Sequence, residues 1–524
     1  MTVAAVDKAV PTSASTNSGL RVHLIFPLLV LAGCIWILSL PVFPSQDGPA
    51  HLYFAEVSAR LFSGSDFFAQ NFQIAHRLPP YAVLYYLLMM LLRWFSPVMA
   101  EKIVVALCFA VPAVGFLRFA RSLGPAGGIV SLAALPLFLH RYLFLGFYNY
   151  SLALGLMWFA MAVWSGVGRS RGRQRVIFLL LVAATTLAHA VTLLLLLGFC
   201  WTQLLLSAWL NRRSATHELS GVRTGDWVTL LCASSSLLYV AHYVDRAAAL
   251  SGNAAVPGSQ FGFYGHRLLE VLQMYLVAPV IGVEYCLLLL LVVIVALAVA
   301  LRATVKDVAA RQVNNSQVSL GWGLLLLAGL AFLPTWMNHA ALFAERLAVP
   351  CVLLIAAAAA RAVPAGKTRV FTLAAAAVCV AAMGMLGPAI NSVSRYVEVP
   401  VREMLPPRQP VLLANALNTP VGLTFDPCRH AGVRLIQQSN GLWLNVGLLD
   451  SDYMMLRPKH DAPEFESLLQ QRPDAAVVVT HCGGDDHGLT GKIMAQYPNR
   501  WKLQRGKWAN VLGPVSRSAF RVSR

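Results

Sequence analysis

The sequence predicts a polytopic α-helical membrane protein with a small C-terminal α/β domain, and three observations lead to this class. Of the 524 residues, 57% are hydrophobic and only 12% are charged, whereas a soluble domain carries about 25% charged residues. The apolar residues form long continuous runs, which differ from the alternating pattern of a membrane β-barrel. Clusters of arginine separate these runs, as expected at the cytoplasmic ends of membrane helices. This composition excludes an ordinary soluble enzyme and a disordered chain.

The N-terminal residues are predicted to form a short cytoplasmic tail, 1–21, followed by a retained membrane helix. The apolar run 22–42 is long for the core of a signal peptide, and no Ala-x-Ala cleavage site follows it. It is the first of about eleven membrane helices in the predicted membrane domain, 22–389. The helices are expected at 22–42, 101–117, 125–140, 148–167, 176–188, 190–210, 227–244, 281–301, 319–336, 342–361 and 370–389.

The basic clusters predict an alternating path with the N-terminus inside and the C-terminus outside. The path keeps the loop 43–100 outside, so its apolar stretch 81–95 is expected to be a short helix lying in the membrane interface. A second interfacial helix is expected at 266–280. If 81–95 spanned the membrane, the run of four arginines at 169–175 would lie outside. Of the nine histidines before residue 390, seven map to the outer side, although only basic clusters defined the path.

Past Pro388 the composition becomes mixed, and residues 390–524 are predicted to form an α/β domain on the outer side. Short apolar runs indicate strands at 411–414, 433–436 and 475–480, and a helix is expected at 464–471. Cys428 and Cys482 form either a disulfide or two separate thiols.

The net charge of +18 does not require a nucleic-acid partner. Seventeen of the 41 basic residues lie in the predicted cytoplasmic clusters, and sixteen lie in the outer domain beside eleven acidic residues. Membrane lipids, rather than nucleic acid, are the expected partners. The stretch 481–487 has residue types that bind metals but lacks the spacing of a zinc site, so we predict a loop and no metal ligands there.

The sharpest polar feature is the stretch 44–51, Pro-Ser-Gln-Asp-Gly-Pro-Ala-His, which directly follows the first helix. Asp47 fits two interpretations. As an N-cap with Pro49 in the first turn, it would only begin a helix. As a carboxylate at the membrane surface, it would act as general base toward an acceptor hydroxyl or amine. In the second case His51 and Glu56 would orient it or contact a substrate phosphate.

Further polar residues lie at the same predicted level of the membrane. Asn149 lies in the first turn of a helix, and His189 interrupts one long apolar run, which predicts two helices joined at this residue. His339 ends one helix, and Glu345 and Arg346 begin the next. These last two residues form either an internal ion pair or a site where Arg346 binds a lipid phosphate, for which a planar guanidinium is well suited.

These features together resemble the GT-C superfamily of membrane glycosyltransferases, which use polyprenyl-phosphate-linked sugar donors. The likeness covers about 22–390 in architecture, and 44–64 and 338–350 in sequence motif. In that superfamily the acidic residue of the first outer loop is the candidate base, and it corresponds to Asp47. Many members carry a second acidic residue in the next outer loop, where Asn149 is the nearest analogue here.

The resemblance implies transfer of a sugar from a polyprenyl-phosphate donor to a lipid, glycan or protein at the outer membrane face. Asp47 would deprotonate the acceptor, and Arg346 and His339 would hold the phosphate leaving group. The other expected substrate contacts are His51, Glu56, Asn149, His189 and Glu345. A divalent metal is compatible with the resemblance, but no ligand set in the sequence supports one. The expected location is a bacterial inner membrane, with the C-terminal domain in the periplasm.

Two other classes of function stay open. A non-catalytic membrane assembly protein could use the same scaffold, and the missing second acidic residue is compatible with that role. A lipid or glycan transporter would place polar residues and Gly or Pro breaks in the middle of its helices. The predicted helix interiors are nearly all apolar, which argues against transport.

Overall fold

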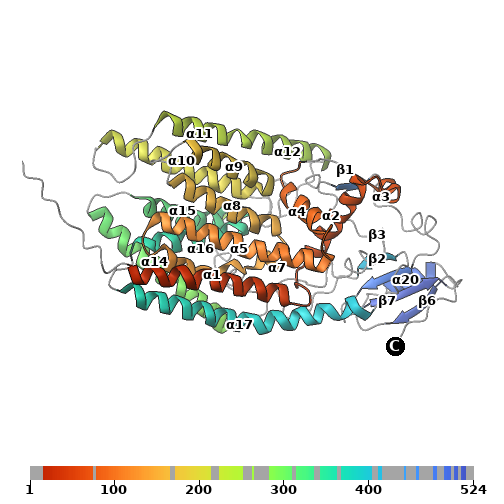
Figure 1. Cartoon of the computed structure of the whole chain (residues 1–524). Helices are drawn as coiled ribbons and strands as arrows, with labels where there is room; N and C mark the ends of the chain where they lie inside the picture. Colours follow the sequence, from red (N-terminus) through yellow and green to blue (C-terminus); the bar gives the residue numbers. More distant parts are fainter. Residues whose placement is uncertain are drawn as a thin grey trace, which may run out of the picture.

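The chain forms a bundle of long helices with a small β-sheet at one end (Figure 1). The computed structural model describes residues 16–74, 78–165, 172–213, 223–251, 262–264, 283–309, 314–334, 343–362, 367–403, 411–415, 442–443, 456–458, 476–480, 489–496, 501–505 and 509–514. Several predictions fall on residues outside these ranges. They concern the interfacial helix 266–280, the runs 433–436, 464–471 and 481–487, and the residues Cys428, Cys482 and His339.

Each predicted membrane helix overlaps a helix of the structure. The helices are α1 (Thr16–Ser39), α5 (Pro97–Leu123), α6 (Gly127–Ala134), α8 (Tyr148–Ser165), α9 (Gly172–Ala188), α10 (Ala190–Arg213), α11 (Thr224–Ser234), α12 (Ser236–Ser251), α14 (Val283–Ala309), α15 (Asn315–Phe332), α16 (Ala348–Ala358) and α17 (Thr368–Glu403). Among the described residues, six segments are long and apolar enough to cross a membrane. The protein is therefore an integral, multi-pass membrane protein.

Two predicted helices are interrupted in the structure. The segment predicted at 125–140 is α6 followed by a 3-10 turn, η1 (Leu135–Phe138), and by the short helix α7 (Arg141–Phe144). Pro136 explains the break, because it lacks the N–H group that would continue the helical hydrogen bonding. The segment predicted at 227–244 is divided at Ser235 into α11 and α12.

Helix α17 continues past Pro388 to Glu403, so the predicted boundary at 390 falls inside a helix. The extended part of the helix contacts the segment that follows α1. The Ser394 hydroxyl donates to the backbone oxygen of Val42 at 2.6 Å, and Val393 and Val397 pack against Val42. These contacts favour a continued helix in spite of the proline, because the extension buries apolar surface against the segment after α1.

The loop 43–100, which we call the outer loop after its predicted side, contains three short helices, α2 (Gly48–Phe62), α3 (Asp66–Asn71) and α4 (Ala82–Leu91), and the strand β1 (Phe72–Ile74). Helix α4 has ten residues and is about 15 Å long, half of the roughly 30 Å apolar core of a bilayer. A short helix that does not span was predicted in this stretch. Strand β1 pairs antiparallel with β4 (Leu456–Pro458). The outer loop and the C-terminal region thus lie at the same end of the bundle (Figure 1).

The C-terminal region contains a mixed sheet of five strands in the order β3-β2-β5-β7-β6. Its strands are β2 (Val411–Asn415), β3 (Leu442–Trp443), β5 (Ala476–Thr480), β6 (Trp501–Arg505) and β7 (Ala509–Pro514), with the helix α20 (Leu489–Gln496) between β5 and β6. Strand β2 is parallel to β3 and β5, whereas β7 is antiparallel to β5 and β6. The apolar runs at 411–414 and 475–480 are strands, as predicted.

Helices α5 and α8 approach each other closely through glycines. A Cβ atom on Gly115 would lie 2.6 Å from the backbone oxygen of Gly155, and a Cβ atom on Gly155 would lie 2.7 Å from the nitrogen of Pro112. The Trp158 ring fills the space beside them, 5.5 Å from the ring centroid of Phe116. Small residues of this kind let membrane helices approach closely enough for their backbones to touch.

The start of α15 is fixed by a reciprocal capping arrangement. The Asn314 side chain accepts hydrogen bonds from the backbone nitrogens of Ser316 and Gln317 at 3.0 and 3.2 Å. The Gln317 side chain accepts in return from the Asn314 nitrogen at 3.1 Å. This capping box satisfies backbone donors that would otherwise lack partners at a helix start.

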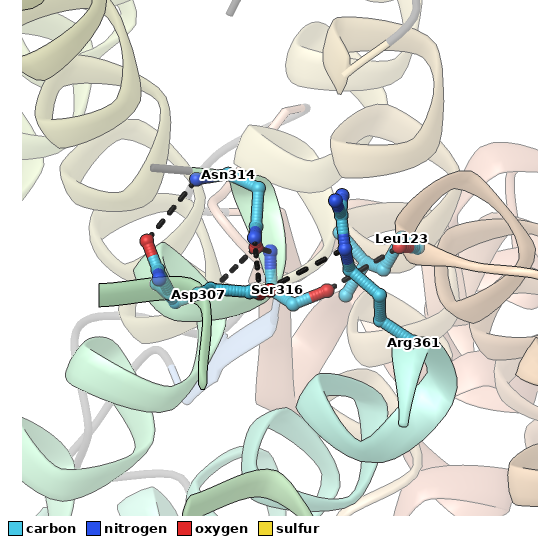
Figure 2. Close-up of polar contacts among 6 residues, drawn as sticks. Leu123, Asp307, Asn314, Ser316 and Arg361 are labelled. Carbon is cyan, nitrogen blue, oxygen red and sulfur yellow. Dashed lines mark hydrogen bonds and ion pairs between the residues drawn. The ribbon is translucent and has the colours of Figure 1, made fainter. Parts of the chain in front are cut away.

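The same cap makes polar contacts with other helices (Figure 2). These contacts lie at the Leu123 end of α5, which is opposite the end where α5 follows the outer loop. The Asn314 amide donates to Asp307 at the end of α14 at 2.7 Å, and Arg361 lies 3.7 Å from the same carboxylate. The Ser316 hydroxyl donates to the Leu123 oxygen at the end of α5 at 3.3 Å. This end therefore depends on polar contacts that link α5, α14, α15 and the 3-10 turn η4 (Ala359–Arg361).

Replacing the cap residue, Asn314→Ala, should lower the unfolding temperature in detergent, because loss of an N-cap costs about 1 kcal/mol and Asp307 also loses a donor. Thermal unfolding followed by intrinsic fluorescence measures the effect. The matched control is Gln70→Ala, which removes an exposed amide in α3. Equal unfolding temperatures for the two variants would contradict the prediction.

Candidate functional site

The segment 40–47 between α1 and α2, which we call the Asp47 loop, lies against the turn between α7 and α8. The backbone nitrogens of Gln46 and Asp47 donate to the carbonyl oxygens of Phe144 and Leu145 at 2.8 and 3.2 Å. Asp47 is the N-cap of α2, but its side chain makes no capping hydrogen bond. The helix thus begins where the sequence predicts, while the half-buried carboxylate is not used to cap it.

Gly146 sets how closely this turn approaches the loop. Its φ angle is +88°, a left-handed conformation that L-residues with a side chain rarely adopt. A Cβ atom at this position would lie 2.7 Å from the Gly48 nitrogen and 3.0 Å from the backbone of Asp47. The absence of a side chain at Gly146 therefore makes room for the backbone at Asp47.

The next residue in the turn, Phe147, contacts Arg346. The guanidinium carbon of Arg346 lies 4.7 Å from the centroid of the Phe147 ring, in cation–π geometry. Arg346 belongs to a buried 3-10 turn, η3 (Glu345–Leu347), and its backbone oxygen accepts a hydrogen bond from the Tyr150 hydroxyl. Asp47 and Arg346 thus contact the same short turn from different parts of the chain.

His189 contacts the guanidinium directly. It separates α9 from α10, as predicted, and is buried. Its Nε2 atom lies 3.1 Å from Nη1 of Arg346. Because a guanidinium has only donors, Nε2 must accept this hydrogen bond, so the ring is neutral and carries its proton on Nδ1. The rings of Tyr81 and Tyr150 meet the imidazole edge-on at 5.5 and 5.3 Å.

Burial determines the protonation of His189 and leaves hydrogen-bond donors of the His189–Arg346 pair without partners among the described residues. Loss of solvent, and then the charge of Arg346, hold the pKa of His189 well below its usual value. Within the described part of the chain, Nδ1 of His189 and Nε of Arg346 are buried nitrogens without a hydrogen-bond partner. An anion could accept from such donors, because a guanidinium fits phosphate oxygens and the imidazole supplies one more N–H group.

His51 lies one turn along α2 from Asp47. Its Nδ1 atom is 3.1 Å from the hydroxyl oxygen of Tyr85 in α4, and its ring lies 6.3 Å from that of Tyr148. Burial raises the pKa of Tyr85, and the nearby Tyr81 and Asp47 raise it further. The hydroxyl of Tyr85 therefore stays protonated and can donate or accept a hydrogen bond beside Asp47.

The remaining sequence candidates are placed differently. Asn149, in the first turn of α8, is buried, and its Oδ1 atom lacks a partner among the described residues. Glu345, which directly precedes Arg346 in the chain, is also buried. The Glu56 carboxylate lies 3.8 Å from the Arg60 guanidinium, and burial raises its pKa. No described contact joins Glu56 to Arg346 or His189. His339 lies outside the described residues.

The pair Glu101 and Lys102 was not predicted as part of the site from the sequence. Both side chains are buried near the start of α5. One carboxylate oxygen of Glu101 accepts from the Ser45 hydroxyl at 2.6 Å and from the Tyr148 hydroxyl at 2.8 Å. Lys102 donates to the Leu38 and Leu40 carbonyl oxygens at 2.8 Å. The available signal was an acid–base pair inside an apolar helix, where charged groups need partners.

The fold defines the class as an integral membrane protein with the GT-C fold. The solved structures that it matches include two of ArnT from Cupriavidus metallidurans. The apo structure has 14% sequence identity and a TM-score of 0.55, covering 95% of this chain and 98% of that one. The structure bound to undecaprenyl phosphate has 13% identity and a TM-score of 0.53, with the same coverage. No family model and no curated protein matches the sequence.

Two glycine variants test the contact between the turn and the Asp47 loop. Gly64 has a φ angle of +79° and nothing within 4 Å of a Cβ atom, so Gly64→Ala carries only the backbone cost of about 1–2 kcal/mol. Gly146→Ala should cost about 1–3 kcal/mol more, because its Cβ atom overlaps the Asp47–Gly48 backbone. Unfolding temperatures measured side by side compare the two, and equal losses would contradict the close approach.

Proposed function

We propose that the protein transfers a sugar from a polyprenyl-phosphate-linked donor to an acceptor hydroxyl or amine on a lipid, glycan or protein. The observation that carries the proposal is the fold shared with ArnT over 95% of the chain, including a structure of ArnT bound to undecaprenyl phosphate. The buried Arg346–His189 pair beside the Asp47 loop supports it, because the pair presents donors suited to a phosphate.

In the proposed reaction, the Asp47 carboxylate takes the proton of the acceptor. The acceptor atom forms a bond to the anomeric carbon, and the bond from that carbon to the phosphate oxygen breaks. Polyprenyl phosphate leaves with the electron pair. Because the leaving group is already a phosphate, catalysis requires mainly positioning and stabilisation of charge. Arg346 and His189 stabilise that charge, and His339 is proposed to hold the phosphate with them.

The other polar residues are proposed to contact the substrates. His51 and Asn149 belong to the elements that hold the Asp47 loop, and Glu345 precedes Arg346 in the same buried turn. Glu56 is proposed to contact the substrate from α2. The described residues contain no group of three or more His, Cys, Asp or Glu side chains that could hold a metal ion. No step of the proposal uses a metal.

We propose that the reaction occurs on the outer face of a bacterial inner membrane, with the N-terminus in the cytoplasm. The pairing of β1 with β4 supports a shared side for the outer loop and the C-terminal region, which is then periplasmic. A Cβ atom on Gly124, which directly follows Leu123 at the end of α5, would lie 2.8 Å from the Cα atom of Arg361, whereas Glu101 lies near the start of that helix. These positions along α5 are about 33 Å apart, close to the roughly 30 Å apolar core of a bilayer.

A non-catalytic assembly protein on the same scaffold is the second candidate. The observation that favours it is the lack of a second acidic residue in the stretch 140–150, where Asn149 is the nearest analogue of the residue that many GT-C members carry. Transfer of radiolabelled sugar from a polyprenyl donor in purified membranes separates the two candidates, because an assembly protein would transfer none.

Asp47→Asn should lower the transfer rate by 100-fold or more, because an amide cannot take the acceptor's proton. The assay is the same radiolabelled transfer, with expression and unfolding temperature measured in parallel. The matched control is Asp66→Asn, which changes an exposed carboxylate in the same outer loop and should leave transfer unchanged. Unchanged transfer by Asp47→Asn would remove its role as base.

Arg346→Lys should raise the KM for the donor about tenfold, since lysine keeps the charge but loses the planar, forked donors of the guanidinium. Initial rates at several donor concentrations measure this change. Arg93→Lys is the control, because Arg93 is exposed after α4. A donor KM that stays the same in both variants would contradict phosphate binding by Arg346.

A further inference from the structure

The buried carboxylate of Glu101 connects the Asp47 loop to α8 by hydrogen bonds. Glu101 is fully buried, and a single oxygen, Oε1, accepts from Ser45 in the loop and from Tyr148 at the start of α8. Both donors are also fully buried. In such surroundings a hydrogen bond to a carboxylate is stronger than at a surface, and losing it leaves a buried polar group unsatisfied.

Gly48 shows how tightly this group fits beneath the loop. A Cβ atom at Gly48 would overlap Oε1 of Glu101, the Ser45 hydroxyl and the Tyr148 hydroxyl. These three polar atoms therefore converge on the Cα atom of the residue directly after Asp47. A hydrogen atom is the only substituent that fits there.

The neighbouring Lys102 fixes the other end of the same segment. Its ammonium donates to the carbonyl oxygens of Leu38 and Leu40, which lie at the end of α1. The chain from Leu40 to Ser45 is thus attached at both ends to consecutive residues of α5. Directly after Ser45, Gln46 and Asp47 donate their backbone N–H groups to the turn before α8.

We propose that Glu101 is a positioning residue for Asp47, which sets the place of its carboxylate through Ser45 and Tyr148. This inference rests on the proposed function and deepens it. Glu101 does not contact substrate in this role; it joins Ser45, two residues before Asp47, to Tyr148 at the start of α8 and so holds the loop in the geometry that the transfer requires. A misplacement of about 1 Å in such a group can slow a reaction 100-fold.

The first test removes one donor at a time. Tyr148→Phe and Ser45→Ala should each lower kcat about tenfold, Glu101→Gln should also lower it, and all three should change the donor KM less than twofold. A residue that merely stabilised the fold would lower the amount of active enzyme and the unfolding temperature instead. The matched controls are Tyr86→Phe and Ser63→Ala, which change exposed hydroxyls of the outer loop and should leave kcat unchanged.

The second test does not depend on activity. Hydrogen–deuterium exchange followed by mass spectrometry reports on the amides of Gln46 and Asp47, which are bonded to Phe144 and Leu145. In Tyr148→Phe and Ser45→Ala, a peptide covering 43–51 should exchange at least fivefold faster than in the wild type. A peptide from the start of α15, at the opposite end of the bundle, should exchange at the wild-type rate.

Each outcome decides between the two proposals. Unchanged kcat and unchanged exchange at 43–51 overturn the positioning role, and so does an equal acceleration of both peptides, which indicates general destabilisation. If Asp47→Asn abolishes transfer in either of these cases, the proposed function stands without the positioning role. Faster exchange at 43–51 in a protein with no transfer activity overturns the proposed function, while the attachment of the loop by Glu101 is supported.

Discussion

The close approach of α5 and α8 is the contact on which the candidate site depends. Where Gly115 faces Gly155, the two backbones touch, and this crossing fixes where the outer ends of both helices lie. The outer end of α5 carries Glu101 and Lys102, and that of α8 carries Tyr148, so the approach brings a carboxylate to a phenol hydroxyl. A bulkier pair of residues would push the two helices apart. The polar contacts at the outer end are therefore a consequence of an apolar one within the bundle.

The arginine side chains at the two ends of the bundle have different kinds of partner. At the end opposite the outer loop, Arg361 meets the carboxylate of Asp307, and Arg175 meets Asp226 at 3.0 Å. At the outer end, the described contacts of the Arg346 guanidinium are a neutral imidazole and an aromatic ring. A buried cation held by such weak partners keeps much of its capacity to bind an anion, because desolvation strengthens its field and little of it is neutralised.

Much of the fold was predictable from the sequence because the bilayer imposes simple rules. Continuous apolar runs and arginine clusters located the membrane helices, and His189 marked the junction of α9 and α10. The break at Pro136 and the continuation through Pro388 were not predicted. The break at Pro136 follows from the missing N–H group of the proline, a local signal that the prediction of one helix at 125–140 did not use. The continuation through Pro388 depends on what the neighbouring chain offers the helix, such as the hydrogen bond from Ser394 to Val42, and a local pattern cannot show a contact over that distance in sequence. For the same reason the sequence placed Asp47 at a helix start but did not identify Glu101, whose partners come from two other segments.

The pairing of β1 with β4 joins the C-terminal region to the outer loop by backbone hydrogen bonds. A few residues after β1, the chain reaches Tyr81, whose ring contacts His189. Folding of the C-terminal region and ordering of the outer loop are thus coupled. The coupling is reciprocal: the free energy by which the paired C-terminal region favours the ordered loop equals the free energy by which the ordered loop favours the paired C-terminal region. A ligand or a neighbouring protein that stabilises one of them therefore also stabilises the other, by at most this coupling free energy.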